Sequence, residues 1–329
     1  MSNLLTNSRL RTYRDCQRKH RLLYVDGWRP VARPDYFHYG ILIHTGLEAW
    51  WKDDGSGRLV AAFDAVAGKW RDEYDRVRVE EVLAGYDWRW TADMDRYEIL
   101  AVEVTITAPL VNLDTGAASR TWLLAGKFDG VVRDRATDEV LVLEHKTTTE
   151  TIEDPTDTYW RKLAMDPQVS HYYLLAEAGG YAPTGCLYDV LLRPRLRPYE
   201  ATPEDKRKYT KRGTLYANQR AEPETPDEFR ERLSADIAAG PERYYQRRPV
   251  PRTESDLREY LGDVWAEGRA IREAEIAGRA TRNPDACHRF GTCEFWVHCA
   301  EGAVLEDLPD QFERSEDVHP ELELDAVTD

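Results

Sequence analysis

The sequence contains no apolar run that approaches the roughly 20 residues that a membrane-spanning helix requires. Its start, "MSNLLTNSRLRTYRDCQRKHRLLY", is polar and basic, without the apolar core of a signal peptide. It also lacks the G-x-x-x-x-G-K-S/T pattern of a phosphate-binding loop, which excludes an NTPase motor of that type. We therefore expect a cytoplasmic protein that has no membrane contact and no motor of its own.

Cysteine is scarce, with five residues among 329. Three of them, Cys287, Cys293 and Cys299, crowd into the stretch "CHRFGTCEFWVHC". Clustered cysteines in an intracellular chain favour metal binding over disulfide formation. Cys186 stands alone in an expected strand, where we expect it to pack as a small hydrophobic residue.

Positive charge is in the minority, and the net formal charge of −15 argues at first against a nucleic-acid partner. Residues 301–329 contain eleven Asp and Glu and one Arg, so they carry −10 and leave −5 for residues 1–300. We expect this acidic tail to be a disordered, solvated extension.

Basic residues nevertheless gather in two stretches, and tyrosines are interleaved with them. Single-stranded nucleic acids need this combination, because positive charge binds phosphates and aromatic rings stack on bases. The alternative for either stretch alone is a solvated basic surface. The basic residues are Arg9, Arg11, Arg14, Arg18, Lys19 and Arg21, and then Arg193, Arg195, Arg197, Lys206, Arg207, Lys208, Lys211 and Arg212. The tyrosines are Tyr13, Tyr24, Tyr199, Tyr209 and Tyr216.

Apolar periodicity predicts a mixed α/β chain whose middle alternates helix, three strands, helix and strand. Pro167 should kink or restart the helix around it. Thr225, Pro226, Glu228 and Gly240 provide the cap, first position, capping box and stop of a further helix. The expected helices cover residues 8–24, 39–51, 59–83, 158–178, 225–240 and 253–278, the expected strands cover 97–110, a hairpin at 121–149 and 185–193, and a loop covers 194–224.

The stretch "AGKFDGVVRDRATDEVLVLEHKTTT", residues 125–149, places charged residues in a hairpin that we expect to be buried, where they are unfavourable unless paired. Glu144 and Lys146 point to one face, because alternate residues of a strand share a face, and Asp129 lies on the neighbouring strand. Adjacent carboxylates repel one another unless a cation bridges them, and hard oxygen ligands suit Mg²⁺ or Mn²⁺. The alternative is a surface hairpin with a cross-strand salt bridge.

Two expected helices add polar pairs at i, i+4 spacing, which lie on one helix face. "GILIHTGLEAW" contains His44 and Glu48, and "DPQVSHYYLLA" contains Gln168 and Tyr172. Each pair alone is ordinary, since a lone histidine of this kind is more often packed in a core than bound to a ligand. In order, however, the sequence reads H-x₃-E, G-x-x-D from Gly126, E-x-K and Q-x₃-Y.

This order resembles the RecB-like branch of the PD-(D/E)xK nuclease superfamily over about residues 40–175. The resemblance implies that Lys146 is the catalytic lysine and that Gln168 and Tyr172 hold DNA and support the active site. Glu103, on the preceding strand, is a further candidate helper. The residues that match the family's metal ligands are His44, Asp129, Glu144 and, through its backbone carbonyl, His145.

The cysteines extend the resemblance. In iron–sulfur RecB-like nucleases, including AddB-type helicase–nuclease subunits and CRISPR-associated exonucleases, one cysteine before the core and three after it bind a 4Fe–4S cluster. Cys16 precedes the core here and the three C-terminal cysteines follow it. The C-x₅-C-x₅-C spacing departs from the shorter C-x₂-C first step of that family, and His288 and His298 keep a Zn²⁺ site as the alternative.

The resemblance implies an α/β fold, with a PD-(D/E)xK nuclease core whose mixed central sheet is flanked by helices. A helical arm and a Cys-ligated metal cluster would be added to this core. The expected domains are residues 1–30 with the first cluster cysteine, 31–193 as the nuclease core, 194–300 as basic loop, helical arm and cluster segment, and 301–329 as the acidic tail.

The activity implied is Mg²⁺- or Mn²⁺-dependent hydrolysis of phosphodiester bonds in DNA, as an exonuclease acting on single strands or duplex ends. The implied setting is phage or bacterial DNA recombination, repair or processing, where phage relatives often work with a single-strand annealing protein. Two alternatives come from other classes. One is a non-catalytic DNA-binding module of the same fold, and the other is a Zn-stapled structural protein whose D…E-x-K is a salt bridge.

Overall fold

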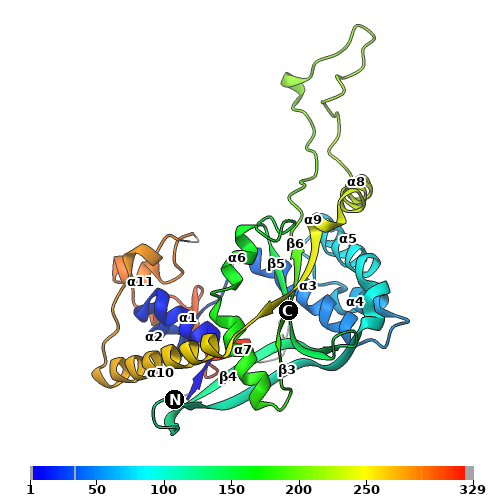
Figure 1. Ribbon diagram of the computed structural model, residues 1–329. Coiled ribbons are helices and arrows are strands. Elements are labelled where there is room, and N and C mark those ends of the chain that lie inside the picture. The colour runs from blue at the N-terminus through cyan, green and yellow to red at the C-terminus, as the bar shows by residue number, and fades with distance from the viewer. Residues whose placement is uncertain (1–2, 33–34, 290, 323–329) are drawn as a thin grey trace.

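The computed structural model describes residues 3–32, 35–289 and 291–322. Its centre is a six-stranded mixed sheet in the order β1-β4-β5-β6-β7, with β3 paired to β4 (Figure 1). Strands β5 and β6 run parallel, as do β1 and β4, and the other neighbours are antiparallel. The strands are β1 (Leu4–Leu5), β3 (Tyr97–Val111), β4 (Ala118–Asp134), β5 (Glu139–Thr148), β6 (Gly185–Leu192) and β7 (Tyr245–Pro251).

Strand β4 has two different partners along one edge. Near its start it pairs with β1 at Leu123 and Leu124, and near its end it pairs with β5 from Gly130 onward. Strand β3 pairs with β4 along the opposite edge. Between its two partners β4 diverges from β5, so the sheet forks immediately before Gly130.

Helices cover both faces of this sheet, which confirms the expected mixed α/β architecture. One face packs against three helices that precede β3 and one that follows β6. The other packs against an N-terminal helix, the crossover helices between β5 and β6 and a long C-terminal helix. The first face carries α3 (Asp35–Lys52), α4 (Arg58–Val66), α5 (Glu73–Trp90) and α8 (Pro226–Ala239). The second carries α1 (Asn7–Asp15), α6 (Thr158–Leu163), α7 (Pro167–Ala178) and α10 (Glu254–Ala277).

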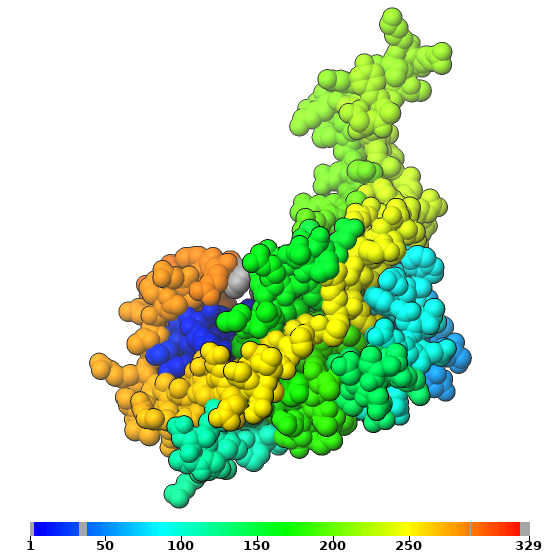
Figure 2. All heavy atoms as spheres, in the orientation of Figure 1, coloured from blue at the N-terminus to red at the C-terminus, as the bar shows by residue number. Residues whose placement is uncertain are grey.

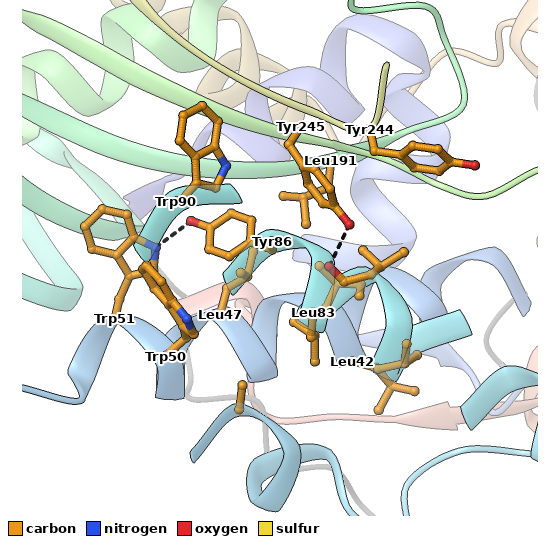
Figure 3. Close-up of a cluster of buried hydrophobic side chains, with 14 of the residues drawn as sticks. Leu42, Leu47, Trp50, Trp51, Leu83, Tyr86, Trp90, Leu191, Tyr244 and Tyr245 are labelled. Carbon is orange, nitrogen blue, oxygen red and sulfur yellow. Dashed lines mark hydrogen bonds between the residues drawn. The ribbon is translucent and has the colours of Figure 1, made fainter. Parts of the chain in front are cut away.

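The core on the α3 and α5 face is rich in large aromatic side chains (Figure 3). The Trp51 indole donates to the Tyr86 hydroxyl at 2.9 Å, so the polar atoms of both rings are satisfied within the core. Tyr245 of β7 donates to the Val82 carbonyl at 3.0 Å. A Cβ at Gly85 would lie 2.2 Å from the Tyr245 hydroxyl, so a glycine there allows β7 to approach α5.

The N- and C-terminal segments pack together. Helix α2 (Gln17–Tyr24) and strand β2 (Trp28–Pro30) contact α11 (Trp296–Glu301) and strand β8 (Phe312–Arg314), which pairs with β2. Leu305 and Phe312 are buried there, so residues 301–322 form packed structure where we expected a solvated extension. These apolar residues anchor an otherwise acidic segment. The rest of the tail, 323–329, lies outside the described residues.

Several expected elements differ in detail. The helix expected at 8–24 is two helices, because Cys16 between them has an extended backbone. The one expected at 59–83 is also two, α4 and α5. Pro167 restarts the helix as expected, and the capping box that begins α8 is confirmed. Among the helices of the described ranges, none combines the length and apolarity needed to cross a membrane.

Candidate active site

Asp129 fills the fork between β4 and β5. The strand pairing ends at Gly130 and Leu143, and beyond it the Asp129 carboxylate accepts the His145 backbone N–H at 2.5 Å. A side chain thus replaces the carbonyl that a continued ladder would supply, which fixes the carboxylate beside the backbone of the E-x-K stretch. The Asp129 carboxylate occupies this position because β4 and β5 separate here.

His44 reaches the same point from α3. Its Nδ1 lies 3.4 Å from Asp129 Oδ1, and both side chains are partly exposed. Burial disfavours the His44 cation, but the Asp129 carboxylate outweighs this and raises the pKa of His44. Burial likewise opposes the Asp129 anion, yet His44 and the His145 N–H hold the pKa of Asp129 well below its usual range. The two groups therefore form a mutually stabilised pair.

Glu144 and Lys146 project together on the other side of the fork, as the strand alternation predicts. Lys146 Nζ donates to Glu144 Oε1. The Glu144 side chain is 5% exposed and the Lys146 side chain 31%, so the carboxylate is enclosed while the ammonium reaches solvent. Burial raises the pKa of Glu144 to about 7, because Lys146 only partly opposes it and Asp129 adds to it. Burial would lower the pKa of Lys146, but Glu144 raises it.

Helix α7 supplies the remaining polar contacts to Glu144. Gln168 donates from Nε2 to Glu144 Oε1 at 3.1 Å and to the Tyr172 hydroxyl at 2.8 Å. Asp166 caps the helix and Pro167 occupies its first turn, which places Gln168 at the start of α7. The structure therefore joins all four motifs of the sequence in one hydrogen-bonded and ionic network.

A glycine makes this approach of α7 possible. A Cβ at Gly126 of β4 would lie 2.6 Å from Leu175 Cδ1 and 3.1 Å from a ring carbon of Tyr172. With a larger residue at this position, the Leu175 side chain or α7 would have to shift. The glycine of the G-x-x-D motif therefore has a packing role, three residues before Asp129.

Glu103 lies on β3 opposite the fork. Its backbone φ of +54° is unusual for a residue with a side chain, and it falls within the part of β3 that faces Asp129 of β4. Its carboxylate pairs with Lys127 at 2.5 Å. Burial raises the pKa of Glu103, Lys127 opposes this, and Asp129 contributes to it. Glu103 thus borders the site but has its own cationic partner.

His145 points to the opposite face of the sheet from Glu144, as expected for adjacent strand residues. Its Nδ1 lies 3.3 Å from Asp189 Oδ2 on β6, and Arg247 of β7 reaches the same oxygen at 3.0 Å. Tyr86 of α5 also donates to Asp189. The peptide between Glu144 and Lys146 is therefore held by Asp129 through its N–H and by Asp189 through the imidazole.

The sequence reasoning missed Asp189 and Arg247. Asp189 interrupts the apolar run "GCLYDVLLR", which is the same signal that singled out Asp129. Arg247 had no comparable signal, because "YYQRRPVP" contains two prolines and adjacent arginines and was not expected to form a strand. In the sheet it is the edge strand β7, where proline is tolerated.

The donor set at the fork fits a hard divalent cation. Asp129 and Glu144 offer carboxylate oxygens and His44 offers an imidazole nitrogen. The Asp129 carboxylate raises the pKa of both Glu103 and Glu144. Within the described ranges, no three His, Cys, Asp or Glu side chains are arranged to hold a metal ion. Here Asp129 is turned toward His44 and Glu144 toward Lys146. A bound cation would exchange these protein contacts for its own.

The structure also brings the termini together around four cysteines. The Arg18 N–H donates to the Thr281 carbonyl at 2.9 Å, and Asn283 donates to the Asp15 carbonyl at 2.8 Å. Burial raises the pKa of the Cys299 thiol, and the proximity of two other cysteine thiols adds to it. Those neighbours are Cys16 and Cys287, and Cys293 lies beside Cys287.

The four thiols are free, and their donor chemistry fits iron–sulfur or zinc. They lie near one another, although within the described residues no three of these side chains are arranged to hold a metal ion. His298 uses Nδ1 in a 2.8 Å contact with the Ala303 carbonyl, and His288 packs against Trp296. Cys186 lies in β6 of the central sheet. It is buried against the Val169 carbonyl, in agreement with its expected packing role.

Comparisons with known proteins identify the family to which this chain is similar. The sequence model described as the PD-(D/E)XK nuclease superfamily matches residues 5–300, which include the fork network and all five cysteines. The search of curated proteins finds no match. A crystal structure from Eubacterium rectale, described as a "putative exonuclease", is similar with a TM-score of 0.47 and 10% sequence identity, over 96% of this chain and 92% of that one.

Proposed function

This chain belongs to the PD-(D/E)XK nuclease superfamily, and we propose that it is a RecB-like DNA exonuclease that depends on Mg²⁺ or Mn²⁺. The observation that supports this most directly is the network at the fork. There two carboxylates, Asp129 and Glu144, lie beside Lys146, whose ammonium group reaches solvent. A substrate phosphate could approach Lys146 without rearrangement of the core.

The side chains of His44, Asp129 and Glu144 and the backbone carbonyl of His145 would hold the cation. When bound, a divalent cation shields phosphate charge and lowers the pKa of a water molecule. The described contacts to Glu144 from Lys146 and Gln168 both end on Oε1. They leave Oε2 as the oxygen of Glu144 that would face the cation.

Lys146 would act on the phosphate itself. Because Glu144 raises its pKa, the side chain stays an ammonium ion at neutral pH. A fixed cation in an enclosed site stabilises the negative charge that develops in the transition state, or orients the attacking water. Gln168 would keep Glu144, and through it Lys146, in position.

The test uses DNA labelled at either end, single-stranded or duplex, with Mg²⁺, Mn²⁺ or EDTA. We expect cleavage with either cation, no cleavage in EDTA, and no cleavage of a closed circular duplex, because an exonuclease requires an end. The double variant D129N/E144Q, prepared identically, controls for contaminating nucleases. Absence of cleavage by the wild-type chain under all conditions would favour a non-catalytic DNA-binding module.

We further propose that Cys16, Cys287, Cys293 and Cys299 bind a 4Fe–4S cluster, with Zn²⁺ as the alternative. The convergence of the termini supports a shared site, and thiolate ligation couples metal binding to folding. Anaerobically purified protein should contain iron and sulfide in near-equal amounts, and Cys16→Ser should be poorly soluble. Cys186→Ser is the matched control and should be mild. One zinc per chain without iron would select the alternative, and neither metal would exclude both.

The proposed setting is DNA recombination or repair in the cytoplasm of a bacterium or a phage-infected cell. An exonuclease that degrades one strand of a duplex leaves a single strand, which a single-strand annealing protein could then bind. Duplexes labelled separately on each strand would show whether one strand survives. Degradation of both strands at equal rates would contradict this role.

A further inference from the structure

The segment between β6 and α8 projects from the molecule as a narrow extension. We call residues 194–224 the arm and residues 206–220 the arm tip. In Figure 1 the arm is the yellow-green extension that runs far beyond α8, and in Figure 2 its outer half stands clear of the rest of the molecule. A segment of this length without a core of its own must be stabilised from within or by a ligand.

The arm is held together internally by hydrogen bonds between its two sides. Thr202 N–H donates to the Arg220 carbonyl at 2.8 Å, and Tyr216 N–H donates to the Lys208 carbonyl at 3.1 Å. The Gln219 side chain bridges the two sides as well, accepting from Lys208 N–H and donating to the Lys206 carbonyl. The arm is therefore a loop, as expected from its sequence, and its two sides are linked by hydrogen bonds.

The base of the arm is joined to the catalytic strand. Arg193 N–H donates to the Thr148 carbonyl at 2.7 Å, and the Arg195 side chain donates to the Thr149 carbonyl. Thr148 ends β5, two residues after Lys146. The arm therefore begins at the same end of β5 and β6 at which Lys146 lies.

The arm tip has the opposite charge from the chain as a whole. It contains six basic and no acidic residues, in a protein of net charge −15. Four of the six form no ion pair with any carboxylate in the part of the chain that the structure describes. These are Lys206, Lys208, Lys211 and Arg212. By contrast, Arg220 pairs with Glu228, and Arg207 donates to backbone carbonyls of the arm.

Two tyrosine rings are exposed among these charges. Tyr209 is 56% exposed and Tyr216 is 46% exposed. Large apolar rings are normally covered by other parts of a protein or by a partner. Unpaired cations bind phosphates and exposed rings stack on bases, and together they form the surface that single-stranded nucleic acids require. Bases inside a duplex are already stacked, so the rings select unpaired nucleotides.

We infer that the arm tip binds single-stranded DNA at a distance from the site of hydrolysis. The inference rests on the proposed nuclease function, because the arm is rooted beside Lys146. It adds a second contact that holds a strand whose end lies at the fork. An acidic protein could also be attracted by the charges, but it would not explain why two rings lie open among them.

The first test neutralises the four unpaired cations by changing Lys206, Lys208, Lys211 and Arg212 to Ala. The matched control removes the same charge from exposed arginines elsewhere on the surface. Those arginines are Arg120, Arg135, Arg258 and Arg279. Affinity for a labelled single strand of about 40 nucleotides is measured by anisotropy without divalent cations, so that hydrolysis is not required.

We expect the arm variant to bind the long strand roughly tenfold or more weakly than the control. Its plot of log affinity against log salt should be shallower by about three units, because each lost phosphate contact removes about 0.7. Cleavage of an oligonucleotide of about six nucleotides, too short to reach both sites, should be unchanged. Equal affinity of the arm variant and the control for the long strand would overturn the inference and point to an acidic protein partner.

The second test separates stacking from charge. Tyr209→Ser with Tyr216→Ser keeps every charge of the arm tip, and Trp88→Ser removes an exposed ring from α5 as the control. We expect roughly tenfold weaker binding of the long strand for each tyrosine lost and no change for Trp88→Ser. An unchanged affinity of the double tyrosine variant would overturn the base-stacking part of the inference.

The two proposals can fail separately. A wild-type chain that binds long single strands through the arm tip but never hydrolyses DNA would contradict the nuclease and support the arm. A chain that hydrolyses DNA with an arm variant indistinguishable from its control would do the reverse.

Discussion

The two faces of strand β5 both carry buried charges, and they differ in how those charges are compensated. On the face toward α3 and α5, His145 meets Asp189 and Arg247 from the two neighbouring strands. On the face toward α7, Glu144 meets Lys146 and Gln168. Sequence position separates the two sets by a single residue, because strand residues alternate between faces.

The α3 and α5 face is closed. Burial opposes the Asp189 anion, but Arg247 and His145 outweigh it and lower the pKa of Asp189 to about 2. The Arg247 guanidinium also packs over the rings of Trp90 and Trp51, at 4.4 and 5.2 Å from their centroids. The Asp189 and Arg247 charges neutralise one another, although among the described residues Asp189 Oδ1 and two guanidinium nitrogens of Arg247 are buried without a hydrogen-bond partner.

The α7 face is open and undercompensated. The pKa of Glu144 is raised to about 7 although an ammonium group touches it. The comparison shows that buried charge alone does not mark a functional site. We propose that the functional site is marked by incomplete compensation together with access to solvent, and these two properties occur together at the fork.

The largest expected effect is on catalysis, from the α7 face. Lys146→Ala should reduce DNA cleavage roughly a thousandfold, because it removes a charge that acts on the transition state. The melting temperature should change little, because Glu144, whose pKa is about 7 even beside Lys146, takes up a proton when the ammonium group is removed. Cleavage of labelled DNA in Mg²⁺ or Mn²⁺ measures the effect.

The control is Lys162→Ala on α6, another lysine paired with a glutamate, Glu150. It should cleave as the wild type does. If Lys146→Ala kept full activity, the α7 face would be a structural salt bridge of the same kind as Lys162–Glu150.

The next effect is on stability, from the opposite face. Arg247→Met leaves Asp189 buried without its cation, so we expect a loss of about 3–5 kcal/mol in the free energy of unfolding. Urea denaturation measures it. The double variant D189N/R247M removes both charges and should recover part of the loss. A double variant no more stable than Arg247→Met would show that packing, and not charge, holds this face.

A smaller effect is expected at Gln168, which supports Glu144 from α7. Gln168→Leu removes a hydrogen bond to the Glu144 anion, so the pKa of Glu144 should rise further and kcat should fall about tenfold. The acidic limb of the pH–rate profile should move to higher pH. Tyr172→Phe, which removes only the acceptor of the second Gln168 bond, should have the milder effect. An unshifted profile would remove Gln168 from the site.

The smallest effect is a difference in pH dependence between the two faces. Burial raises the pKa of Glu144 from its usual 4.5 to about 7, so the folded chain keeps a proton there that the unfolded chain has released. This contribution is full below pH 4.5 and is lost as pH rises to about 7. Without divalent cations, the melting temperature of the wild type should therefore fall between about pH 5 and pH 8 more than that of Glu144→Gln.

Asp189 provides the opposite sign. Its pKa is lowered from 3.8 to about 2, so its contribution is full above pH 3.8 and is lost only as pH falls toward 2. The melting-temperature difference between the wild type and Asp189→Asn should thus stay constant over the same range. Parallel slopes for Glu144→Gln and the wild type would contradict the comparison.

Part of this site was predictable from the sequence because its motifs use short-range geometry. Glu144 and Lys146 share a face through strand alternation, and Gln168 and Tyr172 share one through helical spacing. Their convergence with Asp129 was an expectation of the family resemblance, since no local pattern states where two strands separate. The fork depends on the lengths of β4, β1 and β5 together.

The remaining differences have long-range causes. Arg247 meets Asp189 only because β7 pairs with β6 in that register, and its prolines made β7 a poor candidate for a strand. The packing of Phe312 and Leu305 depends on β2, almost 300 positions earlier in the chain. We predicted a solvated tail there from its many acidic residues. That count took no account of the two apolar residues, Leu305 and Phe312, that are buried.

The most direct test of the account is a calorimetric titration with Mn²⁺ at about pH 8, without DNA, on the wild type, Glu144→Gln and Asp189→Asn. The account predicts that the α7 face recruits the cation that it lacks, so the wild type and Asp189→Asn should bind Mn²⁺ alike. Glu144→Gln should bind it at least tenfold more weakly. Binding by Glu144→Gln that equals the wild type, or loss of binding in a folded Asp189→Asn, would contradict the assignment of the open charge to the α7 face.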